Sequence, residues 1–261
     1  MSEKWIVILG ASSGFGAATA RIFAQKGYGI FGAHMDRRGT MPQVDALKAE
    51  LEGYGVPVLF HNGNAASDSV RKEALDALDE ALIQCNGTVQ VVLHSLAFGT
   101  LRPYVSDDKG TIGRKHMDMT LDVMAHSLVY WVQDLIQRSH LGRGGRIFAM
   151  TSSGSIAAWP AYGAVSAAKC ALESHIRQLA IELAPMGITA NAIMAGVTRT
   201  AALAKIPGAE ELARRAEERN PHGRLTTPED VAHCLVSLSG EGTAWMTGNI
   251  LRVDGGESVS G

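Results

Sequence analysis

Two side chains capable of proton chemistry fall on one predicted helix. Tyr162 and Lys169 lie seven residues apart in the segment Tyr162–Leu183, which has a helical pattern. Residues i and i+7 share one face of an α-helix, so the phenol and the amine should line the same stripe. A phenol can hydrogen-bond to an oxygen that gains negative charge, and an ammonium adds positive potential nearby. The alternative is that Tyr162 packs in the core and Lys169 is a solvated helix residue.

A glycine-rich loop near the start of the sequence favours the catalytic interpretation. It joins a short apolar run, Trp5–Leu9, to a helical pattern, Phe15–Lys26. Glycines allow a tight turn and a close approach of the backbone to a pyrophosphate, which then meets the N–H groups of the helix. A plain turn is the alternative, but strand, loop and helix occur in the order that dinucleotide binding requires. The predicted pyrophosphate contacts are Gly10, Ser12, Ser13, Gly14, Phe15 and Gly16.

The rest of the chain supplies the elements that must position these groups. Short apolar runs alternate with longer helical patterns, which is typical of parallel strands covered by helices on both faces. The predicted strands are Trp5–Leu9, Tyr28–Ala33, Val56–His61, Thr88–His94, Arg146–Thr151, Ile188–Ile193 and Asn249–Val253. The predicted helices are Phe15–Lys26, Asp68–Gln84, Leu121–Arg138, Tyr162–Leu183 and Pro228–Leu238.

This alternation predicts one α/β domain over residues 1–261, with a doubly wound, Rossmann-type, seven-stranded parallel sheet. Two segments, Gly99–His116 and Thr198–Gly223, are predicted to be long loops. Both follow the carboxyl ends of strands, where sheets of this kind bind ligands. We therefore expect the functional site at that edge of the sheet.

Composition narrows the classes of function. A hydrophobic content of 46% against 19% charged residues is typical of a chain that builds a core. The formal net charge of −2 gives no general reason to expect nucleic acid or an anionic membrane as a partner. Cys85, Cys170 and Cys234 lie far apart, which argues against a disulfide framework or a zinc site, and no metal is predicted. The first apolar run is too short for a signal peptide or a membrane span, so we expect a cytoplasmic protein.

Several segments together resemble the short-chain dehydrogenase/reductase family. The loop Gly10–Gly16 has the spacing GxxxGxG, whereas other dinucleotide folds carry GxGxxG. Further matches are Thr198–Thr200, Arg224–Asp230 and Val253–Gly256, and their order extends the resemblance along nearly the whole chain. The resemblance implies an oxidoreductase that transfers a hydride from a nicotinamide dinucleotide to a small substrate.

The candidate catalytic residues resemble a divergent branch of that family. Most members carry Tyr-x-x-x-Lys on one helix, with a serine thirteen residues before the tyrosine. Counting back from Lys169 places Val165 in the tyrosine position, while Ser152 occupies the serine position and Tyr162 lies about one turn earlier. The spacing Tyr-x6-Lys is similar to that of the enoyl-acyl-carrier-protein reductases. These enzymes also lack the fourth-helix asparagine of the ketoreductases, and Met124 stands at that position here. The resemblance implies catalytic roles for Tyr162, Lys169 and Ser152.

Three other segments agree with this branch. His94–Ala97 resembles its His-Ser-Ile/Leu segment, and Ile193–Thr200 resembles its Ile-Ser-Ala-Gly-Pro-x-Arg-Thr segment. Ser152–Ile156 is similar to a subgroup that has serine where many enoyl reductases have a second tyrosine, and members of that subgroup use NADPH. The resemblance implies that Phe98 and Gly99, together with Tyr162, border the acyl site.

The residues after the second predicted strand bear on the choice of nicotinamide cofactor. In an alignment to the family, His34 occupies the position where NAD-preferring members carry an acidic residue. Arg37 and Arg38 follow closely, and two guanidinium groups suit a 2′-phosphate, although Asp36 could restrain an arginine or repel the phosphate. We predict NADPH, with NADH as the alternative. Besides His34, Arg37 and Arg38, the remaining predicted cofactor contacts are Asn64, Ala65, Ser95, Leu96, Lys169, Thr198 and Thr200.

The implied reaction is reduction of the C2=C3 double bond of a trans-2-enoyl thioester in fatty-acid synthesis or a related pathway. The acyl group would be carried by acyl carrier protein or coenzyme A. A ketoreductase that uses Tyr162 or Ser166 on a carbonyl is one alternative, and Val165 and Met124 argue against it because they remove two parts of the usual proton relay. A dinucleotide sensor without turnover is another, and the retention of Tyr162 and Lys169 argues against it.

Oligomeric state follows from the same resemblance. Family members usually form tetramers through their long fourth and fifth helices, which correspond here to Leu121–Arg138 and Tyr162–Leu183. A homotetramer is therefore expected.

Overall fold

Seven parallel strands form the centre of the computed structural model, which describes residues 3–107 and 110–260. The strand order is β3-β2-β1-β4-β5-β6-β7, and the chain reverses its direction of growth between β1 and β4. The strands are β1 (Glu3–Leu9), β2 (Gly29–His34), β3 (Val58–Asn62), β4 (Gly87–His94), β5 (Leu141–Thr151), β6 (Thr189–Ala195) and β7 (Ile250–Val253). This confirms the predicted doubly wound, Rossmann-type sheet, and each predicted strand overlaps an observed one.

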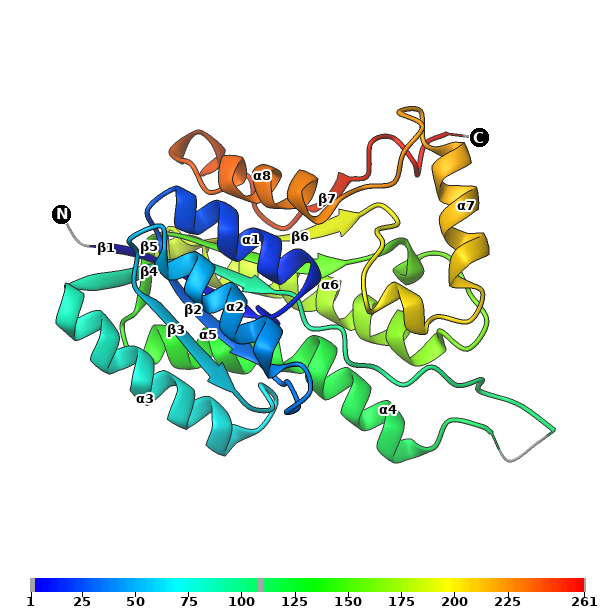
Figure 1. Cartoon of the computed structure of the whole chain (residues 1–261), viewed down its shortest axis with the longest axis horizontal. Coiled ribbons are helices and arrows are strands. Elements are labelled where there is room, and N and C mark those ends of the chain that lie inside the picture. The colour runs from blue at the N-terminus through cyan, green and yellow to red at the C-terminus, as the bar shows by residue number, and fades with distance from the viewer. Residues whose placement is uncertain (1–2, 108–109, 261) are drawn as a thin grey trace.

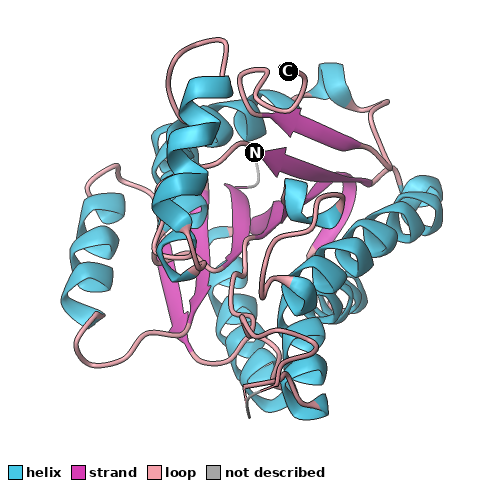
Figure 2. Cartoon of the chain, turned by 90° about the vertical axis from the view of Figure 1, so that its right-hand side faces the viewer, coloured by secondary structure: helices cyan, strands magenta, loops and turns pink. Residues whose placement is uncertain are grey.

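Helices cover both faces of the sheet, as the continuous apolar strands require (Figures 1 and 2). One face packs against α1 (Gly14–Gln25), α2 (Met41–Glu52) and α8 (Pro228–Leu238). The other face packs against α3 (Asp68–Cys85), α5 (Ser127–Gln137) and α6 (Gly163–Leu183). Successive β1 residues alternate between the two cores, because adjacent side chains of a strand point to opposite faces.

Two helices lie outside the predicted set. Helix α2 buries Val44, Leu47 and Leu51, an i, i+3, i+7 pattern that the prediction omitted. Helix α7 (Ala209–Arg219) falls inside Thr198–Gly223, so the prediction of a loop there was wrong for these residues. Ala209, Leu212, Ala213 and Ala216 of α7 follow the i, i+3, i+4, i+7 spacing of an apolar stripe, but three of them are alanines and only Ala213 and Ala216 are buried.

The predicted helix Leu121–Arg138 is part of a longer helical run. It begins as α4 (Arg114–Leu121), so the predicted loop Gly99–His116 ends earlier than expected. A single π-helical turn, Asp122–His126, joins α4 to α5. Such turns are rare and often lie near functional sites, and this one contains the buried Met124.

No helix among the described residues is both long enough and apolar enough to cross a lipid bilayer.

Candidate active site

The loop between β1 and α1 leaves no room for larger side chains. A Cβ on Gly10, which has φ of +94°, would lie 2.7 Å from the Ser95 carbonyl oxygen, and a Cβ on Gly16 would overlap the Gly10 carbonyl. Gly14 lies against Thr200, since its Cβ would be 3.5 Å from the threonine methyl group. Because Ser13 makes no side-chain cap, the first N–H groups of α1 remain available to an anion. The structure thus brings predicted cofactor residues from three segments to one place, beside the uncapped N-terminus of α1.

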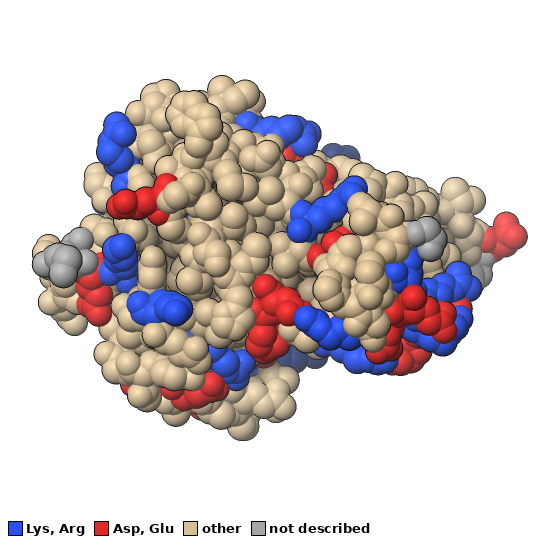
Figure 3. Space-filling model, turned by 90° about the horizontal axis from the view of Figure 1, so that it is seen from above, with Lys and Arg blue, Asp and Glu red and all other residues tan. Residues whose placement is uncertain are grey.

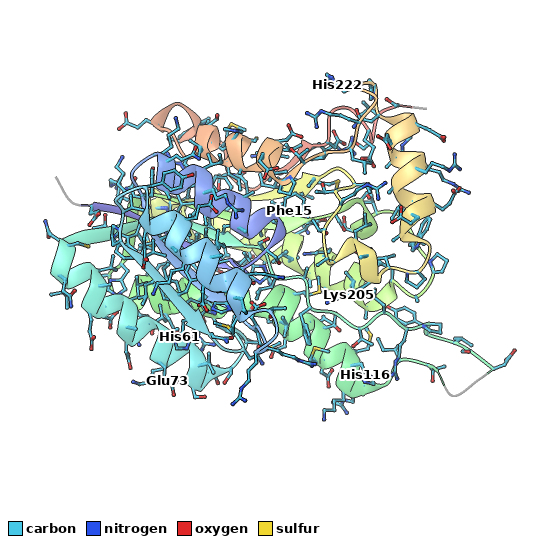
Figure 4. The ribbon with its side chains drawn as sticks, in the orientation of Figure 1. Phe15, His61, Glu73, His116, Lys205 and His222 are labelled. Carbon is cyan, nitrogen blue, oxygen red and sulfur yellow. The ribbon has the colours of Figure 1, made fainter. Side chains whose placement is uncertain are left out.

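These segments meet at the carboxyl edge of the sheet. In Figure 4, Phe15 at the start of α1, Lys205 after β6 and His116 on α4 surround the end of the sheet to which the strands point. Ser95 and Leu96 follow β4, and Asn64 and Ala65 follow β3. Ala65 is buried, and its carbonyl oxygen accepts a hydrogen bond from the Trp131 indole. Asn64 is exposed, and its side chain accepts the Ala66 amide.

Asp36 pairs with residues other than the two arginines beside it. His34, buried at the end of β2, places Nδ1 3.0 Å from the Asp36 carboxylate. Burial by itself would raise the pKa of Asp36, but hydrogen bonds from Ser12, Thr40 and His34 outweigh it and lower that pKa. Arg37 and Arg38 are exposed and form no ion pair with any residue that the structure describes. The carboxylate therefore lies beside the glycine loop, while both guanidinium groups remain available to a phosphate.

Tyr162 and Lys169 lie on or next to α6, as predicted. Tyr162 is the residue immediately before the helix, and Lys169 follows two turns later. Burial raises the pKa of Tyr162 above its usual value of 10, although Ser152 opposes the shift. The Ser152 oxygen is itself buried and makes no hydrogen bond of normal geometry with a described residue. A protonated phenol and an unsatisfied hydroxyl thus lie together at the end of β5.

Lys169 is buried beneath the same site. Its ammonium donates a hydrogen bond of 2.7 Å to the Met150 carbonyl oxygen of β5. Burial lowers the pKa of Lys169 to about 8, and the negative charge of Glu173 one turn later limits the shift. Glu173 is held in place by a 2.6 Å hydrogen bond from Thr151. Sequence patterns alone did not identify Glu173, because a carboxylate on a helix is usually solvated.

An apolar cluster occupies the positions of the missing relay residues. Met124 and Val165 are 2% and 5% exposed and pack together with Val123 and Ala168. A Cβ added to Gly99 would come within 2.6–2.9 Å of Val165, Met124 and a Thr120 methyl group. The cluster therefore leaves no polar side chain at these two positions, and no room for a side chain between them and Gly99.

His94 is a further buried residue at the end of β4. Its Nε2 lies 2.9 Å from the Ser127 hydroxyl, which in turn donates to the Val123 carbonyl. Burial and then the positive charge of Lys169 lower the pKa of His94 to about 3, so the ring is neutral. The sequence placed His94 next to the predicted cofactor contact Ser95, but nothing in the pattern indicated its burial.

Aromatic side chains lie on the segments next to Tyr162. The Tyr104 ring lies on Gly163, where a Cβ would be 2.8 Å from the phenol oxygen. Trp159 donates a hydrogen bond of 3.0 Å to the Pro207 carbonyl, which ties the segment before α6 to the segment after β6. Phe98 is half-exposed on the neighbouring loop. Phe98 and Tyr104 thus expose aromatic surface close to the start of α6, and Tyr104 and Trp159 were not among the predicted site residues.

Charged side chains of both signs lie on α7. Arg214 pairs with Glu211 and Glu218, and Arg215 pairs with Glu211. In the view from above, acidic and basic residues intermingle at the end of the molecule that holds α7 (Figure 3). The face shown there has no uniformly basic region of the kind that binds nucleic acid.

Together with the comparisons that follow, the fold defines the class of the protein: it is an oxidoreductase with a Rossmann-type sheet that binds a nicotinamide cofactor. The sequence profile of the family described as Enoyl-(Acyl carrier protein) reductase matches residues 10–258. The chain belongs to this family, a branch of the short-chain dehydrogenases/reductases.

Individual relatives agree with the family but differ in activity. A 1-cyclohexenylcarbonyl-CoA reductase of Streptomyces collinus is 28% identical over 97% of this chain and 86% of its own length. An enoyl-[acyl-carrier-protein] reductase [NADH] of Aquifex aeolicus is 30% identical over 67% of this chain and 64% of its own. An NADPH-dependent aldehyde reductase-like protein of Arabidopsis thaliana is 28% identical over 98% and 94%. The chain is thus similar to enzymes that reduce different substrates with either cofactor.

Solved structures show the same fold. The crystal structure of FabI from Candidatus Liberibacter asiaticus superposes with a TM-score of 0.86 and 25% identity, over 99% of this chain and 98% of that one.

Proposed function

We propose that this protein reduces the C2=C3 double bond of a trans-2-enoyl thioester with NADPH. The observation that carries the proposal is the buried apolar pair of Met124 and Val165, packed against Gly99, with Tyr162 one turn before Val165. A carbonyl substrate needs a proton at the developing alkoxide, and the two relay positions that would supply it are apolar and filled. An enoyl thioester instead needs its carbonyl oxygen stabilised some distance from the carbon that is reduced, which a displaced tyrosine can do.

The side chains of the site then have separate roles. The reduced nicotinamide, when bound, would supply the hydride that C3 of the acyl group accepts, and the resulting enolate would take a proton at C2 from solvent to give the saturated thioester. Tyr162 donates a hydrogen bond to the thioester oxygen as negative charge develops there, and its raised pKa keeps the phenol protonated. Lys169 holds the nicotinamide ribose hydroxyls and adds positive potential. Ser152, buried beside Tyr162, orients the phenol or the substrate.

The remaining predicted contacts are assigned in the same way. The glycine loop binds the pyrophosphate, Arg37 and Arg38 bind the 2′-phosphate, and Thr198 and Thr200 hold the nicotinamide end. His34, Asn64, Ala65, Ser95 and Leu96 complete the cofactor contacts. Phe98 and Gly99 border the acyl chain, whose carrier is acyl carrier protein or coenzyme A.

A comparison of two substrate classes tests the proposal. Purified protein with NADPH is offered a trans-2-enoyl thioester and a matched β-ketoacyl thioester, and loss of reduced-cofactor absorbance gives each rate. We expect turnover of the enoyl substrate and almost none of the ketoacyl substrate, with mass spectrometry showing a saturated acyl product. Tyr162→Phe, which removes only the hydroxyl, should bind cofactor as the wild type does and lose most of this turnover.

A hydroxyacyl product formed at comparable or greater efficiency would overturn the enoyl reductase assignment and leave only the family. Near-wild-type activity of Tyr162→Phe would instead show that another group stabilises the thioester oxygen.

A further inference from the structure

One buried carboxylate joins both ends of the segment that follows β6. Glu257, which is 4% exposed, lies in the turn after β7. Its Oε2 accepts a 2.9 Å hydrogen bond from the Val197 backbone amide, and its Oε1 lies 3.2 Å from Nη2 of Arg219. Val197 begins, and Arg219 ends, the segment 197–219. A single side chain therefore fastens this segment at its two ends.

The segment 197–219 forms one side of the proposed nicotinamide and acyl sites. It carries Thr198 and Thr200, and Thr200 contacts the glycine loop at Gly14. It also carries Pro207, which accepts the Trp159 hydrogen bond, and it ends with α7. Any shift of its ends would therefore move the two threonines relative to the glycine loop.

The turn that presents Glu257 is itself held rigidly. The Asp254 carboxylate accepts hydrogen bonds from the Gly256 and Ser258 amides at 3.0 and 3.1 Å. Asn220, directly after α7, donates a 2.9 Å hydrogen bond to the Asp254 carbonyl oxygen. In Figure 1, the red segment after β7 passes beside the end of α7, and Figure 4 labels His222 at this place.

The Glu257 carboxylate is also closely packed against the backbone at Gly196. A Cβ on Gly196 would lie 2.8 Å from the Glu257 carboxylate and would overlap the Thr226 hydroxyl. Arg219 is the cation paired with Glu257 among the described residues, and its side chain is 47% exposed. Burial of a carboxylate costs free energy unless its partners are kept, and Glu257 has one backbone amide and one partly exposed cation as partners. Its burial therefore argues for a specific role.

We propose that Glu257 is a positioning residue that holds the segment 197–219 so that Thr198 and Thr200 meet the nicotinamide end of the cofactor. The inference rests on the proposed function only in assigning those two threonines to the nicotinamide. It does not depend on the acyl substrate or on which cofactor is preferred.

Binding measurements separate this role from a general loss of stability. Each variant is titrated with NADPH and with 2′-phospho-ADP-ribose, which lacks the nicotinamide, or with NADH and ADP-ribose if the wild type prefers NADH. Glu257→Ala should weaken the whole cofactor about tenfold, equivalent to about 1.4 kcal/mol, and the fragment less than twofold. Glu257→Gln keeps an acceptor for the Val197 amide but loses the charge that pairs with Arg219, so it should show a smaller loss, again confined to the whole cofactor.

The matched control is Asp230→Asn. Asp230 forms an ion pair with Arg224 and takes part in the capping box of α8, and none of its hydrogen bonds or ion pairs with described residues involves the segment 197–219. This variant should lower the melting temperature without changing the ratio of the two affinities. Equal losses of cofactor and fragment in the Glu257 variants, or no loss of either, would overturn the proposal; if Glu257→Ala does not fold, Glu257→Gln decides. Because no turnover is measured, the outcome does not depend on the enoyl substrate assignment.

Discussion

Burial changes the acid–base behaviour of the two side chains that the sequence first drew attention to. The raised pKa of Tyr162 keeps its phenol protonated through neutral and mildly alkaline pH. The pKa of Lys169, lowered to about 8 from its usual 10.5, brings the loss of its charge into the range of ordinary assays. The groups that act on Lys169 are Glu173 on the same helix and His94 at the end of β4, and His94 is neutral throughout this range.

Cofactor binding should therefore weaken as the pH rises through about 8. Only the charged ammonium donates strongly to the ribose hydroxyls, and about a tenth of Lys169 remains charged one pH unit above its pKa. The apparent Kd for NADPH should accordingly be about tenfold higher at pH 9 than at pH 7. Fluorescence titrations across this range give the profile directly.

Lys169→Met is the control for this profile, because it cannot titrate and should bind weakly with little dependence on pH. A wild-type Kd that is constant from pH 7 to 9.5 would show that the charge of Lys169 does not contribute to binding.

At the scale of elements, the ends of strands decide which groups meet the cofactor. Strand β2 ends at His34, and the turn after it directs Asp36 toward Ser12 and leaves Arg37 and Arg38 exposed. Strand β5 ends at Thr151, so that Ser152 and the start of α6 lie together. These short connections place polar groups at one edge of the sheet, where parallel sheets bind their ligands.

Replacing both Arg37 and Arg38 by alanine should weaken NADPH selectively. Two charge-assisted contacts at exposed positions are worth about 1.4–3 kcal/mol together, so the loss should be about 10- to 100-fold, with little change for NADH. Arg21→Ala, which removes an exposed arginine paired with Glu50, is the matched control. Equal losses for the two cofactors, or a wild type that prefers NADH, would refute the assignment of a 2′-phosphate site.

At the scale of the whole molecule, α5 and α6 pack on the same face of the sheet and correspond to the helices through which family members usually associate. Helix α6 carries Ile181, whose side chain is 72% exposed in the single chain. An exposed isoleucine on a helix that is proposed to lie at an interface is consistent with burial in an assembly.

We expect light scattering to give about four times the chain mass of 27.7 kDa. Ile181→Glu should reduce this mass, since a charge would be buried at the interface. Ile83→Glu, at a similarly exposed position on α3 and therefore outside the two proposed interface helices, should leave it unchanged. A mass of one chain for the wild type would exclude the homotetramer.

Local patterns were sufficient to predict the sheet, the glycine loop and the stripe that holds Tyr162 and Lys169. Each depends on neighbouring residues: strand alternation, helical spacing and the order of strand, loop and helix are properties of short segments. The capping box of Thr227 and Asp230 at the start of α8 is local in the same sense, and that helix has the predicted bounds. The sequence by itself thus determined the architecture and the edge of the sheet that holds the site.

Tertiary structure alone decided the contacts between distant segments. Glu257 meets Val197 and Arg219 across 60 and 38 residues, and no periodic pattern indicates such a meeting. The burial that lowers the pKa of Lys169, and the contacts of Met124 and Val165 with Gly99, arise only when α6, the π-helical turn and the loop after β4 pack together. Helix α7 was missed because its apolar stripe consists mainly of small alanine side chains among charged residues, which give only a weak hydrophobic signal. The sequence predicted which side chains could take part in catalysis, whereas long-range packing determined their charge and their neighbours.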